Sequence, residues 1–177
     1  MVSNQVRAAT NIVFGRPGLG YGGTVTMTSN IVVSGSVTKR GTWTLAWRNT
    51  NSFGGPVVVD GADGMLRVEG LWSLGTNASD VIVSNGTLFI TNTTAYVFAG
   101  TNGGMRMGLV TGGGAWWTNG VGGLTIGSNA QVMVTATGKL AYAGTLMVSS
   151  VTASAYGLVV TNGGQVLGAA SAYVGYG

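Results

Sequence analysis

Apolar and polar residues alternate along this chain in short runs, and the clearest runs lie between Leu124 and Gly144. Three apolar pieces occur there, at 124–126, 132–134 and 140–142, and Gly, Ser, Asn and Thr fill the gaps between them. Within each piece every second residue is apolar, which is the alternation of a strand with one buried face. Three strands and three turns in about 21 residues describe one triangular coil of a β-solenoid.

The same pattern recurs on both sides of this stretch, and the first residues of the recurrences give the repeat length. Recurrences begin at Val57, Val81, Leu124 and Leu146. The first and last of the three intervals are each close to one coil, and the middle interval is close to two. Repeats of this length cannot fold alone, because the backbone entropy lost on ordering them exceeds what a few buried side chains return. Stacking of the coils is therefore required.

We therefore predict an all-β fold, a right-handed parallel β-helix (β-solenoid) with three short strands per coil of about 21–22 residues. About eight coils, stacked about 4.7–4.9 Å apart, would be roughly 40 Å long. The chain divides into an irregular N-terminal segment or cap, 1–23, and a β-solenoid, 24–177, which is most regular from residue 57 onward. The inward-facing side chains are predicted to include Val81, Val83, Leu88, Ile90, Leu124, Ile126, Val132, Val134, Leu140, Leu158 and Val160.

Pairs of Ser or Thr followed by Asn stand near the strand ends and predict the corners of the coils. Asparagine tolerates the left-handed backbone conformation that a tight corner requires, and glycine often follows it in this chain. Stacked coils would align some of these amides along a corner, which is a structural role. The pairs occupy residues 29–30, 76–77, 84–85, 91–92, 101–102, 118–119, 128–129 and 161–162.

Composition supports strands and excludes several other classes of protein. Only 7% of residues are charged and 33 are glycine, but 45% are hydrophobic, which excludes a disordered chain. The glycines have no three-residue period, so collagen is excluded as well. No window carries a helical apolar stripe that Gly or Asn does not interrupt, and no apolar run approaches the roughly 18 residues of a membrane-spanning helix. The segment from Met1 to Gly20 has no basic stretch followed by an apolar core, so we predict no signal peptide in it.

The ionisable residues offer little chemistry. The chain has no cysteine and no histidine, so disulfides, thiolate metal sites and histidine catalysis are excluded. The formal net charge is +4, and only Lys39 and Arg40 are adjacent basic residues, so no nucleic-acid interface is predicted. Asp60 and Asp63 form the only close carboxylate pair, and they flank a turn, where aspartate is common. We predict no catalytic, cofactor-binding or metal-binding residue and no cofactor.

Several glycine-rich phrases resemble the repeats of a known family. They are Val110–Asn119, Gly123–Gly127, Leu158–Gly164 and Tyr173–Gly175. These phrases look like the repeats of bacterial autotransporter-type surface proteins, long secreted chains built on a right-handed parallel β-helix. The resemblance covers roughly residues 57–177. It implies an extracellular or cell-surface location and a structural or adhesive role.

Two functions of different classes remain open. The first is a structural protein rather than an enzyme: a secreted or cell-surface β-solenoid that self-associates into a filament, fibre or surface layer. The second is a β-helix protein that binds or cleaves carbohydrate, with surface polysaccharide as its partner. The repeat pattern continues to the C-terminal residues, and no charged residue follows Lys139. Open sheet edges of this kind favour pairing with another copy, unless the chain is a piece of a longer solenoid whose further coils cover them. The candidate self-association residues are Trp43, Trp47, Trp116, Trp117, Tyr173 and Tyr176.

Overall fold

The computed structural model describes residues 5–15, 22–70, 73–75, 79–91, 96–100, 105–149 and 157–176. All regular secondary structure in these ranges is β-strand, which confirms the all-β prediction. The strands are β1 (Gln5–Ala8), β2 (Ile12–Phe14), β3 (Thr24–Met27), β4 (Asn30–Val33), β5 (Val37–Lys39), β6 (Thr44–Trp47), β7 (Ser52–Phe53), β8 (Val57–Val68), β9 (Val81–Ile90), β10 (Tyr96–Phe98), β11 (Arg106–Thr111), β12 (Ala115–Asn119), β13 (Leu124–Ile126), β14 (Ala130–Thr135), β15 (Lys139–Tyr142), β16 (Leu146–Ser149), β17 (Leu158–Val160), β18 (Gln165–Gly168) and β19 (Ala172–Tyr176).

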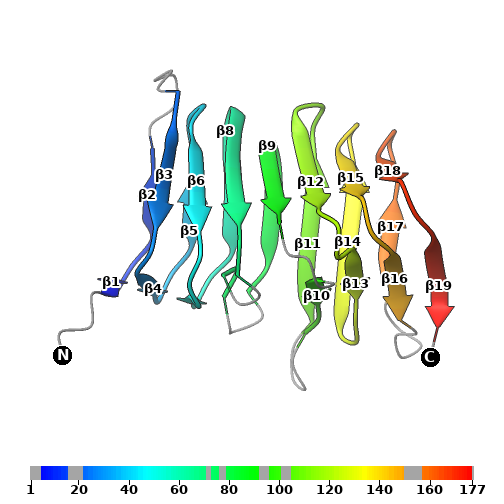
Figure 1. Cartoon of the computed structure of the whole chain (residues 1–177), viewed down its shortest axis with the longest axis horizontal. Helices are drawn as coiled ribbons and strands as arrows, with labels where there is room; N and C mark the ends of the chain where they lie inside the picture. Colours follow the sequence, from blue (N-terminus) through cyan, green and yellow to red (C-terminus); the bar gives the residue numbers. More distant parts are fainter. Residues whose placement is uncertain are drawn as a thin grey trace.

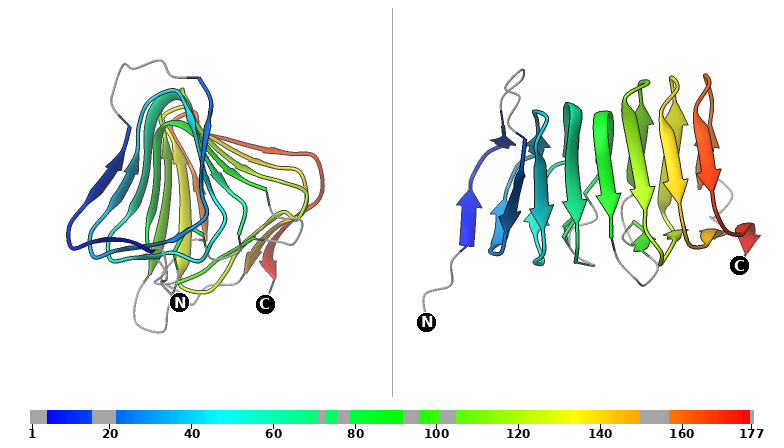
Figure 2. Two further views of the ribbon diagram at one scale, coloured as in Figure 1. Left: turned by 60° about the vertical axis from the view of Figure 1, so that its left-hand side comes forward. Right: turned by 45° about the horizontal axis from the view of Figure 1, so that its top comes forward.

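Parallel strands about 24 residues apart stack on one another and form a β-solenoid of about six turns (Figure 1). The two views of Figure 2 show the coils overlying one another along one long axis, with the N- and C-terminal coils at opposite ends. The parallel solenoid predicted from the repeat pattern is thus confirmed.

The prediction of about eight coils is wrong, because the coils are longer and less uniform than the repeat pattern indicates. Val37 pairs with Val57 across a short coil, whereas Leu88 pairs with Trp117 across a much longer one. The segments between strands therefore differ in length from coil to coil. Most strand pairs stay in register, and among the described residues the register shifts only in β8-β9 around Asp60 and in β16-β19 after Val148. Such variation is tolerated at corners, since lengthening a surface loop adds little to its entropic cost.

Three columns of strands run along the solenoid. The first column is β2-β5-β8-β9-β11-β14-β17, and the second column is β3-β6-β8-β9-β12-β15-β18. Strands β8 and β9 belong to both columns, because each continues through the corner that separates two shorter strands in other coils. The third column is described in two parts, β1-β4-β7 and β10-β13-β16-β19. The stretch 124–142, predicted as one complete coil, supplies one strand to each column: β13, β14 and β15.

Inward side chains of the three columns form one apolar core. The nine predicted inward residues from Val81 to Leu140 are at most 1% exposed, as predicted. Leu158 and Val160 are in register with the inward Val132 and Val134, so they face inward as predicted, but Leu158 is only partly buried and Val160 is 46% exposed. Both belong to β17, and no strand among the described residues pairs with its outer edge.

Large and small residues alternate within this core so that the coils can stack. Trp117 is fully buried and packs edge-to-face against Phe98, with 5.2 Å between ring centroids. The space facing its ring is left free by Gly108, where a Cβ would lie 2.8 Å from the indole and 3.2 Å from Val132. In the same way Gly168 lies directly over the ring of Tyr142, where no Cβ could fit. The glycines of these strands therefore serve the packing of aromatic rings.

Asparagines turn two corners as predicted and stabilise others differently. Asn129 and Asn162 have positive φ angles of 51° and 48°. Asn30, Asn85 and Asn119 lie within strands and are not among the residues with positive φ, while Asn77, Asn92 and Asn102 lie outside the described residues. The Ser/Thr-Asn signal therefore marks the region of a corner more reliably than its backbone conformation.

Asn51, which the sequence analysis did not single out, links three successive coils. It is 2% exposed; its Oδ1 accepts a hydrogen bond from the Ile31 amide at 2.9 Å, and its Nδ2 donates to the Ser73 carbonyl at 2.7 Å. One buried amide therefore satisfies backbone groups of the coil before it and the coil after it.

The solenoid begins within the segment 1–23 for which the sequence predicted an irregular segment or cap. β1 pairs with β4 and β2 pairs with β5, both in parallel register. Residues from Gln5 to Phe14 therefore form part of the first coil rather than covering it.

Candidate functional site

The close carboxylate pair lies at the corner of β8, beside a pocket of about 300 Å³. Asp60 forms an ion pair with Arg40, with 3.3 Å between Oδ2 and Nε, and both side chains are about 40% exposed. Asp63 is exposed and turns the corner with a positive φ of 57°. The residues that line the pocket are Arg40, Gly41, Thr42, Asp60, Gly61, Ala62 and Asn85.

This pocket contains one carboxylate, and an arginine already neutralises it. Asp63 is not among the lining residues, although it lies only three positions from Asp60. A two-carboxylate hydrolysis needs two groups facing one bound substrate in different environments. Among the described residues, no three acidic side chains gather at a place that could hold a metal ion. The two aspartates are thus placed as corner residues, in line with the interpretation of 60–64 as a turn.

A lysine lies buried beneath the same corner, and the sequence analysis missed it. Lys39 is 1% exposed and occupies an inward position opposite Phe14 on one side and Val59 on the other. Its ammonium donates to the carbonyl of Arg40 at 3.1 Å and to that of Gly41 at 2.6 Å. The alternation of position 39 with the buried Val37 was the signal that could have identified it.

Burial lowers the pKa of Lys39 from 10.5 to about 8. Among the described residues no carboxylate forms an ion pair with it, and the remaining contact is the Trp43 ring, whose centroid lies 4.8 Å from Nζ. The ammonium is therefore held by two backbone carbonyls and an aromatic face in an otherwise apolar core. The Lys39 side chain therefore connects the backbone of the corner at residues 40–41 to the interior of the solenoid.

Arg106 is the second buried cation and lies at the start of β11. It is 4% exposed, its Nε donates to the Ser79 carbonyl at 2.9 Å, and its guanidinium lies 4.2 Å from the centroid of Phe98. Burial raises the pKa of the neighbouring Tyr96 phenol, and the positive charge of Arg106 only partly opposes this effect. Like Lys39, the arginine joins core and corner without a carboxylate partner among the described residues.

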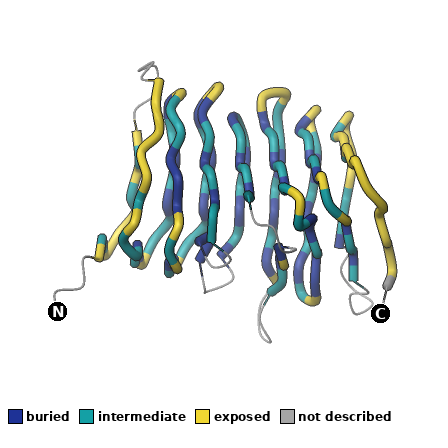
Figure 3. Tube along the Cα trace, viewed as in Figure 1, coloured by how far each residue is buried: buried dark blue, intermediate teal, exposed yellow. Residues whose placement is uncertain are grey.

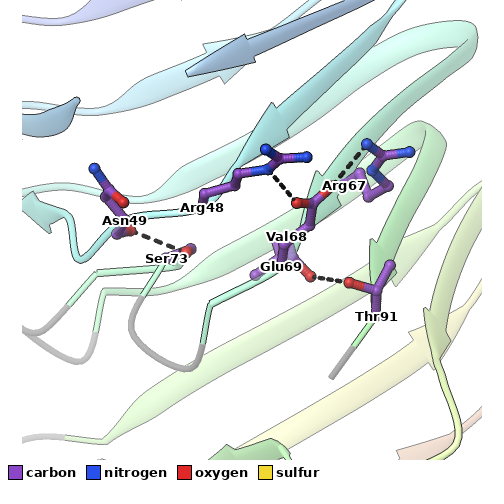
Figure 4. A network of polar contacts seen from close by, with 7 residues as sticks. All are labelled: Arg48, Asn49, Arg67, Val68, Glu69, Ser73 and Thr91. Atoms are coloured by element: carbon purple, nitrogen blue, oxygen red, sulfur yellow. Dashed lines mark hydrogen bonds and ion pairs between the residues drawn. The ribbon is translucent and has the colours of Figure 1, made fainter. Parts of the chain in front are cut away.

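Glu69 lies between two arginines from neighbouring coils (Figure 4). Its carboxylate is 2.6 Å from Nε of Arg48 and 2.6 Å from Nη2 of Arg67. Burial would raise the pKa of Glu69, but the hydrogen bond from Arg48 and the charges of both arginines outweigh that effect and hold the pKa below its usual value. The three charges form a clamp across the corner after β6 and β8.

Hydrogen bonds from side-chain hydroxyls also link neighbouring coils along this corner. Ser73 Oγ donates to the Asn49 carbonyl at 2.9 Å, and Thr91 Oγ1 donates to the Val68 carbonyl at 3.1 Å (Figure 4). The charged and polar groups along this corner thus hold one coil to the next.

The structure separates the six candidate self-association residues. Trp47 and Trp117 are 1% and 0% exposed, so they are core residues and cannot contact another chain. Trp43 and Trp116 are partly exposed, and each carries a lysine ammonium over its ring, Lys39 at 4.8 Å and Lys139 at 4.3 Å. Tyr173 is 48% exposed. The Tyr176 side chain lies outside the described residues.

Exposed residues gather at the two ends of the stack (Figure 3), and some of them are apolar residues at positions that are buried in a middle coil. In the first coil the inward Val25 is 50% exposed, and in the last the inward Val160 and Val174 are 46% and 75% exposed. Among the described residues no strand pairs with the outer edges of β1, β2 and β3 or of β17, β18 and β19. Each end therefore combines open backbone groups with open core.

Comparisons with protein-family models, with curated proteins and with solved structures found no match for this chain. The class that the fold defines is a β-solenoid repeat protein, with about six turns of parallel strands. No helix long and apolar enough to cross a membrane occurs in the part of the chain that the structure describes.

Proposed function

We propose that this protein is a structural assembly unit, a β-solenoid that self-associates end to end into a filament, fibre or surface layer. The observation that carries the proposal is the pair of open ends, where apolar side chains that would be buried in a middle coil are about half exposed or more. Unpaired strand edges are templates for pairing with another chain unless charge, proline or a covering element blocks them. Among the described residues of the last coil, β17–β19, there is neither charge nor proline.

The two ends match each other strand by strand. The edge strands of the last coil are β19 in the third column, β17 in the first and β18 in the second, and those of the first coil are β1, β2 and β3 in the same columns. A second copy placed head to tail would continue every column in parallel. Such a contact is heterologous and does not close on itself, so it generates a filament.

The proposal places the protein outside the cell or on its surface. The support is the likeness of its glycine-rich repeats to those of bacterial autotransporter-type surface proteins.

A carbohydrate-binding function is the alternative, and one observation favours it. A pocket of about 360 Å³ beside β3 is lined by Gly22, Gly23, Thr24, Val25 and Trp43. A partly exposed indole that lines a pocket together with two glycines suits stacking against a sugar ring. A glycan array probed with the wild-type chain and with Trp43→Ala tests it: binding that disappears in the variant would favour this alternative.

Sedimentation velocity and negative-stain microscopy at micromolar concentration test end-to-end assembly. We expect the wild-type chain to elongate. Val174→Lys, which places a charge on the open core of the last coil, should abolish elongation, whereas Leu167→Lys, on the outer face of that coil, should not. A folded wild-type monomer at these concentrations, or a Val174→Lys variant that elongates normally, would overturn the proposal.

A further inference from the structure

The first column of strands presents a line of outward-facing residues that is almost entirely apolar. Strand pairing aligns one residue from each of seven strands, and six of the seven residues are apolar. They face outward because the residues that flank them in sequence, such as Val132 and Val134, are the fully buried ones. The line, called the outer apolar ladder below, consists of Val13, Thr38, Val58, Ile82, Leu109, Met133 and Val159.

The ladder is a narrow stripe with polar neighbours. Two residues beyond Leu109 and Met133 on the same strands, the outward positions are Thr111 and Thr135, which pair with each other. The aligned outward positions of the second column are mixed, since Trp116 is followed by Lys139 and then Gln165. The third column has a partly apolar line in its second part, including Val97 and Tyr173, whereas the aligned outward positions of its first part are Arg7, Val32 and Ser52.

Size decides what such a stripe can bind. Seven strands at about 4.8 Å give a length of roughly 30 Å, and a width of about 10 Å gives roughly 300 Å² on each partner. Two chains joined by this stripe would bury roughly 600 Å² in total, about half of the 1,200 Å² at the lower limit of stable interfaces. One ladder is therefore too small to hold a dimer. The side chains within it are mostly partly buried by their neighbours along the ladder, which reduces the available area further.

The small area of one ladder no longer limits the contact when many copies of the chain are stacked end to end. The ladder starts in the first coil, at Val13, and continues to the last, at Val159, so head-to-tail copies would join their ladders into one continuous stripe. Many weak contacts on two rigid partners then add up, because every contact after the first is intramolecular. Little charge opposes the approach: beside the ladder, Arg40 and Asp60 form an ion pair, and the Asp80 carboxylate accepts a hydrogen bond from the Met107 amide at 2.7 Å.

We propose that the outer apolar ladder is the lateral contact between filaments, and that its partner is the same ladder on a second filament. This inference rests on the proposed end-to-end assembly. It makes bundles or sheets, rather than single filaments, the assembled form of the protein.

Two matched double variants test it in the full chain. Leu109→Lys with Met133→Lys places paired lysines on the ladder, and Thr125→Lys with Met147→Lys places an equivalent pair on the outer face of the third column. Both pairs are aligned, outward-facing and partly exposed, so the cost of neighbouring like charges to folding is comparable. Circular dichroism and thermal unfolding check that both variants fold.

Negative-stain microscopy of filament width gives the readout. We expect the wild-type chain and the Thr125→Lys/Met147→Lys variant to form bundles. The Leu109→Lys/Met133→Lys variant should form single filaments, with complete loss of bundling. Bundles of unchanged width in the ladder variant would overturn the inference, as would loss of bundling in both variants or in the third-column variant alone. Single filaments in the wild type would remove the inference and leave end-to-end assembly standing. No filaments of any kind would remove both.

Discussion

Lys39 gives the sharpest test of how the solenoid core is built, because its buried ammonium couples stability to pH. Burial lowers its pKa from 10.5 to about 8, while the unfolded chain keeps the ordinary value. Between these two values the unfolded state binds more protons than the folded state. Stability therefore rises with pH across this window, since the protonated lysine is the form that the core disfavours.

The size of the effect follows from the two pKa values. Each pKa unit corresponds to about 1.4 kcal/mol, so the full shift is worth roughly 3 kcal/mol. Below pH 8 both states hold the proton and the folded state bears the whole cost. Raising the pH from 7 to 9.5 should recover about 2 kcal/mol of the free energy of unfolding, because the folded lysine is then largely neutral and the unfolded one is still charged.

Urea unfolding followed by circular dichroism at pH 7, 8, 9 and 9.5 measures this rise. Lys39→Met should abolish it, whereas Lys139→Met, which removes an outward-facing lysine stacked on Trp116, should retain it. Burial raises the pKa of Tyr96 in the folded state, so this phenol lowers stability only as the pH approaches the ordinary tyrosine value of about 10, and its effect up to pH 9.5 is small and opposite in sign to the rise expected for Lys39. A free energy of unfolding that is flat or falls between pH 7 and 9.5, or an equal rise in Lys39→Met, would refute the reasoning.

Three further predictions concern packing and the corner acids. Gly108→Ala should destabilise the fold by about 1–3 kcal/mol, because the new methyl group would meet the Trp117 ring at 2.8 Å; urea unfolding measures the loss. Ile126→Asp should unfold at least the adjoining coils, because an unpaired charge would enter a fully buried position; limited proteolysis and circular dichroism would show this, and native-like resistance would contradict it. Replacing Asp60 and Asp63 together with Asn should change the free energy of unfolding by at most about 1 kcal/mol, since the ion pair to Asp60 is exposed, and should leave assembly unchanged. Loss of a polysaccharide-cleaving activity in that double variant would overturn the structural assignment.

The architecture could be predicted because each strand of a solenoid shows a local alternation of apolar and polar residues, which is visible in the sequence. In the coil 124–142 every inward position is apolar and every gap carries turn residues, so strand positions and column assignment follow from the sequence alone. The turn count could not be predicted equally well. The offset between paired strands is short where Val37 meets Val57 and much longer where Leu88 meets Trp117, and alternation contains no information on how long a corner can be.

The burial of particular side chains was harder to predict, for two physical reasons. In a chain rich in small residues, Trp47 and Trp117 look like residues of an exposed contact surface, but both are buried. Trp117 fits into the core because Gly108, on another strand, leaves the volume that the indole occupies. Val160 has the alternation of a core residue, but burial in a solenoid also requires a coil on each side. How exposed an inward side chain at an end of the stack is depends on whether another coil covers it, and the sequence of its own strand does not give this information.

The few charges of this chain are placed where they hold coils together. From the sequence they look like a thin background on the surface, yet Lys39 and Arg106 lie in the core and Glu69 joins Arg48 to Arg67 across a corner. Monomeric β proteins commonly keep charges on strand edges and faces to prevent association. Here most of the charged groups that could serve that purpose are engaged in the core and at the corners. The open ends and the outer apolar ladder are left almost without repulsion, and this is the physical reason to expect assembly along the stack before association between stacks.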